Sequence, residues 1–118
     1  MAEYHPQKST TTADTLARFI RSPLNGDLNA VPGIGPVAIE ELKEAGITTS
    51  YQLLSKFMEF KRADCSSMEN CELFWLWLKD HCPKLRGTRS AVVQACAMKL
   101  DIAFPGLYDP DAYPALER

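Results

Sequence analysis

The sequence of 118 residues has no long uninterrupted apolar run. Because a membrane-spanning helix needs about 20 consecutive apolar residues, no membrane insertion is predicted. The N-terminus is polar and has no signal-peptide pattern. We therefore expect a protein of the nucleus or cytosol.

The four cysteines form no C-x-x-C pair, and there are two histidines. The spacing of Cys65, Cys71, His81 and Cys82 matches no standard zinc module, so no metal site is predicted and the cysteines are expected to be thiols. No nucleophile–base pair and no paired carboxylates stand at credible spacing. The sequence therefore predicts a protein without catalysis or cofactor.

An excess of basic residues, typical of nucleic-acid binders, is also missing. There are 13 Lys and Arg against 15 Asp and Glu, and the net charge is −2. Any binding of DNA must then come from a local site rather than from a global field. The densest basic cluster consists of Lys84, Arg86 and Arg89, which could flank a phosphate held by the hairpin, although charge alone favours a solvated loop.

No stretch shows the alternation expected of a strand, whereas apolar residues recur at helical spacing along most of the chain. We predict an all-α fold, a compact five-helix domain of the SAM/helix-hairpin-helix kind. The expected organisation is a disordered polar tail at 1–12, the domain at 13–104, and an extended acidic tail at 105–118. The predicted helices cover 15–22, 36–46, 50–60, 72–81 and 90–103.

The stretch Val31-Pro32-Gly33-Ile34-Gly35-Pro36 is the centre of this prediction. Glycine tolerates positive φ, and a proline such as Pro36 suits the first position of a helix. Apolar residues lie in phase on both sides. The pattern predicts a helix-hairpin-helix, with Ile34 inserted into the core.

Such a turn offers backbone N–H groups at the start of a helix, where they lack intrahelical acceptors and the helix dipole attracts anions. A phosphate of duplex DNA fits this site, and its recognition through backbone groups would be independent of base sequence. The alternative is a plain tight turn between packed helices. The expected donors are Gly33, Gly35, Val37 and Ala38.

The segment Glu72–His81 is apolar around most of its circumference. A helix of this kind is buried on several sides or contacts a partner. Since aromatic residues are enriched at interfaces, Trp75 and Trp77 are candidates for a protein interface.

The order of these motifs resembles the barrier-to-autointegration factor family. The resemblance extends from about Thr11 to Phe104 and rests on the Gly33-Ile34-Gly35 turn, on the Tyr51, Leu54 and Phe57 spacing, and on Trp77-Leu78-Lys79-Asp80 followed by Cys82. It implies a nuclear, dimeric, chromatin-associated protein that binds and bridges double-stranded DNA without sequence preference. It also implies binding to LEM-domain proteins, and phosphorylation at Thr11 and Thr12.

The candidate site residues follow from the hairpin, the basic cluster and this resemblance. For DNA they are Gly33, Ile34, Gly35, Val37, Ala38, Lys43, Arg86 and Arg89; for the dimer or partner interface they are Phe57, Phe60, Leu73, Trp75 and Trp77.

Glu40 and Glu41 stand where the family has lysines. Two acids facing a phosphate backbone would repel it by about 1 kcal/mol each at the surface. The alternative function is therefore a dimeric protein-interaction scaffold of the same fold, with weakened or lost DNA binding.

Overall fold

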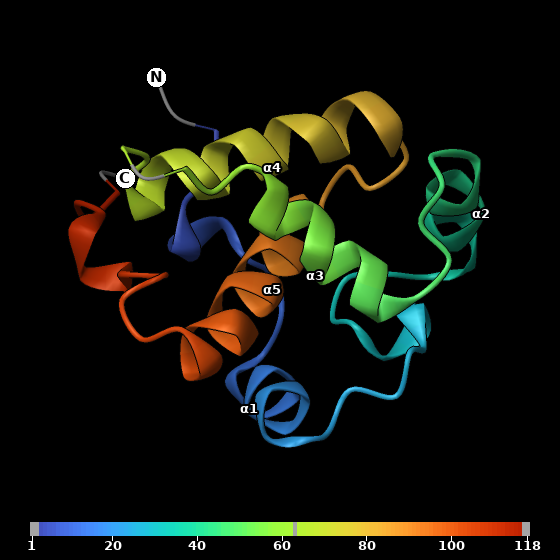
Figure 1. Cartoon of the computed structure of the whole chain (residues 1–118), viewed down its shortest axis with the longest axis horizontal. Helices are drawn as coiled ribbons and strands as arrows, with labels where there is room; N and C mark the ends of the chain where they lie inside the picture. The colour runs from blue at the N-terminus through green and yellow to red at the C-terminus, as the bar shows by residue number, and fades with distance from the viewer. Residues whose placement is uncertain (1–2, 63, 117–118) are drawn as a thin grey trace.

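The computed structural model describes residues 3–62 and 64–116, and in these residues every α-helix predicted from the sequence is present and no strand occurs (Figure 1). The all-α prediction is confirmed. None of the helices in these two ranges is long and apolar enough to cross a membrane. The five α-helices are α1 (Ala13–Arg21), α2 (Pro36–Glu44), α3 (Ser50–Glu59), α4 (Ser67–His81) and α5 (Arg89–Ala103), and three short 3₁₀ helices are η1 (Pro6–Lys8), η2 (Leu28–Ala30) and η3 (Pro110–Ala112).

Each helix begins at a residue that the local chemistry favours. The Thr12 hydroxyl accepts the Thr15 N–H at the start of α1, and Pro36 is the first residue of α2. Thr49 and Ser66 each form a capping box, at the starts of α3 and α4 respectively. These contacts satisfy N–H groups that a helix terminus leaves without partners.

Helix α4 begins at Ser67, five residues before the predicted start at Glu72. Its hydrophobic stripe begins after residue 70, so periodicity alone missed the polar first turn. The Ser66–Glu69 capping box fixes the start.

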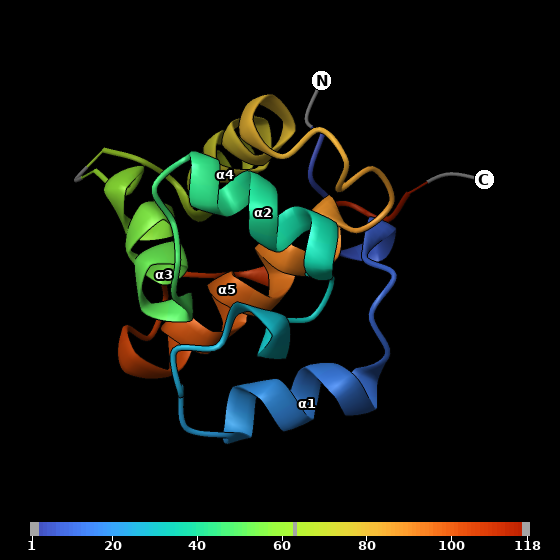
Figure 2. The same cartoon turned by 90° about the vertical axis from the view of Figure 1, so that its right-hand side faces the viewer.

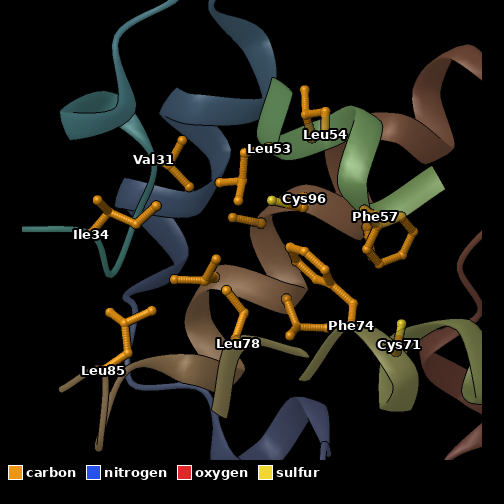
Figure 3. Packing of buried hydrophobic residues seen from close by; sticks show 14 of the residues in the cluster. Val31, Ile34, Leu53, Leu54, Phe57, Cys71, Phe74, Leu78, Leu85 and Cys96 are labelled. Atoms are coloured by element: carbon orange, nitrogen blue, oxygen red, sulfur yellow. The ribbon is translucent and has the colours of Figure 1, made fainter. Parts of the chain in front are cut away.

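Helix α5 lies in the centre and contacts α1, α3, α4 and η1 (Figures 1 and 2). Its residues from Ala91 to Val93 and from Ala95 to Ala97 are all buried. Figure 3 shows side chains of α3 and α4 and of the turn before α2 meeting over this helix. The core therefore joins the hairpin to the rest of the domain, with Ile34 6% exposed.

Residues 3–8 and 107–116 pack together and form what we call the terminal clasp. The Tyr4 side chain is 1% exposed, and its hydroxyl lies 2.6 Å from that of Tyr108. His5 Nε2 lies 2.6 Å from the Pro114 carbonyl oxygen, and the Leu116 N–H donates to the Gln7 side chain at 2.7 Å.

The terminal clasp differs from the predicted tails. Composition predicted disorder at 1–12 and an extended segment at 105–118, because each is polar or proline-rich when taken alone. Together they bury aromatic rings that neither could bury by itself, and the Glu72 carboxylate accepts the N–H groups of Glu3 and Tyr4. Residues 1, 2, 117 and 118 of these tails lie outside the described residues.

Candidate nucleic-acid interface

The two hairpin glycines have different structural roles. Gly33 has a φ of +93°, and a Cβ atom there would lie 3.0 Å from the Thr88 carbonyl oxygen and 3.0 Å from a Val92 methyl group. Its missing side chain therefore lets the hairpin pack against the first turn of α5. Gly35, in contrast, has an extended backbone and open space where a Cβ would lie.

The start of α2 is open to an anion. Within the described residues, the N–H groups of Gly33, Gly35, Val37 and Ala38 have no hydrogen-bond acceptor. Val37 is 54% exposed, whereas Ala38 is 5% exposed. The accessible donors are thus centred on Gly35 and Val37, with the partial positive charge of the helix terminus behind them.

Ile34 has the structural role expected of it, but it offers nothing to a phosphate. Its side chain is buried and its N–H donates to the Val31 carbonyl oxygen at 3.1 Å. Its assignment to the DNA-binding set is therefore corrected: Ile34 fixes the turn from inside.

The segment at 82–88, which we call the basic loop, lies beside the start of α2 (Figure 2). The Glu41 carboxylate accepts the Lys84 N–H at 3.3 Å, and the Thr10 hydroxyl donates to the Gly87 carbonyl oxygen at 3.4 Å. Leu85 is 3% exposed. The basic loop is therefore anchored from α2, from the N-terminal segment and from the core.

The candidate cations lie at different distances from the hairpin. Arg86 is exposed on the basic loop, and Arg89 is the first residue of α5, directly after Thr88. Lys43 lies seven residues after Pro36, about 10 Å along the helix axis. Its ammonium group is 3.6 Å from the Glu40 carboxylate, an exposed pair that weakens the local positive charge.

Glu40 and Glu41 of α2 are not equivalent. The side chain of Glu40 is 72% exposed, whereas that of Glu41 is bound to the basic loop. Burial raises the pKa of the nearby Cys82 thiol to about 11; the Glu41 carboxylate adds to this rise and Arg89 opposes it. Both carboxylates are negative charges on α2, but only that of Glu40 is free of the basic loop.

The predicted protein interface divides into buried and accessible residues. Phe57 is 0% exposed and packs edge-on against Phe74, with ring centroids 5.2 Å apart. It cannot contact a partner, so its assignment to the interface is corrected: helical spacing marks its face as apolar but does not tell core from interface. Phe60 and Leu73 are half-buried.

The two tryptophans of α4 contact different parts of the molecule. Trp77 stacks on His81 at 4.5 Å between centroids, and the Lys56 ammonium lies 5.3 Å from its ring. Trp75 contacts Lys79 and Arg89 instead. The pair therefore does not form a single aromatic patch.

Thr11 and Thr12 lie between the terminal clasp and α1. Thr12 is exposed and its hydroxyl caps α1, while Thr11 is half-buried. No group of three His, Cys, Asp or Glu side chains in the described ranges could hold a metal ion.

A family model described as barrier to autointegration factor matches residues 10–100 of the chain. The chain belongs to the barrier-to-autointegration factor family. Membership of this family, which is non-enzymatic, nuclear and chromatin-associated, indicates a DNA-binding function. No curated protein and no solved structure matches the chain. The hairpin, the basic loop and α5 up to Leu100 lie inside the matched residues, whereas the terminal clasp lies entirely outside them.

Sequence reasoning missed the anchors of the basic loop. Glu41 was identified by its charge, and nothing in the local pattern pairs it with the Lys84 N–H, 43 positions away. The contact of Trp75 with Arg89 likewise joins two helices. The i,i+4 spacing of Trp75 and Lys79 was the one local signal that a cation lies near this ring.

Proposed function

We propose that this protein binds double-stranded DNA without sequence preference and without catalysis, and that its dimer bridges two duplexes. The main support for this proposal is the open start of α2. There the N–H groups of Gly35 and Val37 lack acceptors within the described residues, and Gly35 leaves room for a phosphate. Arg86 and Arg89 would supply the flanking positive charge. This contact involves no base edge, so affinity would not depend on sequence.

The test is a fluorescence anisotropy titration with two short duplexes of unrelated sequence at low and at moderate salt. We expect equal affinities that fall with salt, because bound phosphates release counterions. Gly35→Val places a side chain into the open space and should weaken binding severalfold while the helical CD spectrum is retained. Ser55→Val, an exposed position on α3, is the matched control. Strong preference for one duplex, or an unchanged affinity in Gly35→Val, would contradict the proposal.

The second candidate function is a protein-interaction scaffold, and the exposed Glu40 carboxylate on α2 favours it. In this case no DNA complex forms even at low salt. The partner surface would include Phe60 and Leu73, which remain accessible, and its occupants would be a second copy of the chain or LEM-domain proteins. Sedimentation velocity of the wild type and of Leu73→Asp tests the dimer: the wild type should sediment as a dimer and the variant as a monomer.

A further inference from the structure

The Trp75 ring connects α4 to the first turn of α5. The Arg89 guanidinium carbon lies 5.2 Å from the ring centroid, and the Lys79 ammonium lies 6.0 Å from it. A cation over the face of an indole is attracted by the ring quadrupole. Arg89 contacts this ring more closely than Lys79 does, although Lys79 is on the same helix as Trp75.

A second contact restricts Arg89. Its Nη2 donates to the Pro83 carbonyl oxygen at 3.1 Å, and its Nε is buried and has no acceptor in the described chain. The guanidinium is thus held by an aromatic ring and by a backbone carbonyl of the basic loop. The donors that remain for a ligand are at the Nη end of the group.

The place where Arg89 is held is next to the hairpin. Thr88, the preceding residue, has its carbonyl oxygen 3.0 Å from the position that a Cβ of Gly33 would occupy. The first turn of α5 and the turn before α2 are therefore packed together. Arg89 follows Thr88 directly, so it begins α5 next to the turn whose open N–H groups would hold a phosphate.

We infer that Trp75 is a positioning residue for DNA binding: it holds the Arg89 guanidinium in an orientation ready to pair with a phosphate beside the hairpin. A long arginine side chain loses considerable rotamer freedom when it binds. Trp75 reduces that loss because the side chain is already ordered in the free protein. The inference rests on the proposed DNA-binding function and adds to it a residue that itself need not contact DNA.

A double-mutant cycle separates this role from a structural one. Trp75→Leu keeps an apolar side chain and removes the ring, and Trp75→Phe restores a ring. With Arg89 present, Trp75→Leu should weaken binding about two- to fivefold, and Trp75→Phe should recover most of the loss. In an Arg89→Ala background the same Trp75→Leu change should have no further effect, because Trp75 acts through Arg89.

Two controls complete the design. Leu76→Ala truncates an exposed apolar side chain of α4 next to Trp75 in the sequence and should leave DNA affinity unchanged. In a Lys79→Gln background the effect of Trp75→Leu should persist. Equal losses from Trp75→Leu with and without Arg89, or a dependence on Lys79 instead, would overturn the inference.

A measurement without DNA distinguishes failure of the inference from failure of the proposed function. The ring current of Trp75 should shift the NMR signals of the Arg89 side chain in the wild type, and this shift should vanish in Trp75→Leu. A missing shift overturns the inference whatever the DNA result. If the shift is present but the wild type binds no DNA, the proposed function fails and the positioning role fails with it.

Discussion

The hydroxyl groups of Tyr4 and Tyr108 lie 2.6 Å apart in a buried hydrogen bond between residues 104 positions apart in the chain. The sequence around either tyrosine does not reveal this bond, because the composition of each segment predicts a tail. The bond, with the rings of Tyr4 and Tyr113 edge-on at 5.6 Å, makes the terminal clasp part of the fold.

Removing one of these hydroxyls should therefore destabilise the domain. Tyr4→Phe leaves the Tyr108 hydroxyl buried without its partner, and we expect a loss of about 1–3 kcal/mol in the free energy of unfolding. The double variant Tyr4→Phe/Tyr108→Phe should lose less free energy of unfolding than the sum of the losses in the two single variants. The reason is that the double variant removes both hydroxyls and leaves neither one buried without its partner. Urea denaturation of the four proteins measures this coupling, and strict additivity would contradict it.

The same tyrosines predict a loss of stability at alkaline pH. Burial raises the pKa of Tyr108 to about 12, and burial with the nearby Tyr108 hydroxyl raises the pKa of Tyr4 as well. In the unfolded chain these phenols lose their protons near pH 10. Between about pH 10 and 12 the unfolded state therefore binds fewer protons than the folded state, and the free energy of unfolding falls as pH rises.

The expected slope is about 1.4 kcal/mol per pH unit for each such tyrosine. Denaturation at a series of pH values should show a smaller slope in Tyr4→Phe/Tyr108→Phe than in the wild type. The buried Cys71 thiol, with its pKa raised to about 12 by burial, acts in the same direction and is retained in both proteins, so it cancels in the comparison. Equal slopes would show that the tyrosines do not ionise on unfolding.

Two glycines with positive φ, Gly33 and Gly46, predict different outcomes for the same substitution. Gly33→Ala forces positive φ on alanine and places a methyl group against the backbone of α5, so we expect a loss of about 1–3 kcal/mol or more in the free energy of unfolding. Gly46 has a φ of +89° and open space around it, so Gly46→Ala reports the cost of the backbone conformation alone. Chemical denaturation should show Gly33→Ala to be the more destabilised of the two. If both cost the same, the packing of Gly33 against α5 contributes nothing.

Glu40 and Glu41, neighbours on α2, also predict different outcomes when they are replaced. Glu40→Lys replaces an exposed negative charge near the hairpin, and we expect DNA affinity at low salt to rise about fivefold or more, with thermal stability unchanged. Glu41→Ala removes the acceptor of the Lys84 N–H and should lower the melting temperature. Anisotropy titration and thermal unfolding of both variants measure these effects. A stable Glu41→Ala protein with the wild-type melting temperature would show that the basic loop does not depend on this anchor.

Local patterns predicted the helices and the hairpin well because the signals are themselves local. The Ser66–Glu69 pair, Pro36 and the two hairpin glycines act on their nearest neighbours, and the sequence shows them directly. The candidate donors could be proposed for the same reason: a helix start is recognisable from its residues.

The packing of the hairpin, the division between core and accessible residues, and the terminal clasp could not be predicted. Each depends on contacts between residues that are distant in the chain. Gly33 is needed for packing because Thr88 approaches it, whereas Gly35 has open space around it. The spacing of residues in the sequence does not show that Thr88 comes close to this turn. Phe57 is in the core and Phe60 is accessible because the face of α3 that carries Phe57 packs on Phe74. The terminal clasp requires both ends of the chain at once.

The terminal clasp also makes the two ends of the chain depend on each other. His5 and Pro114 are in contact, so each of the two segments covers part of the other. A single protease cut after Lys8 would release η1 and leave Tyr108 and Tyr113 without the ring they pack on. Loss of one end thereby makes the other susceptible to cleavage, although more than 90 residues separate them in the sequence.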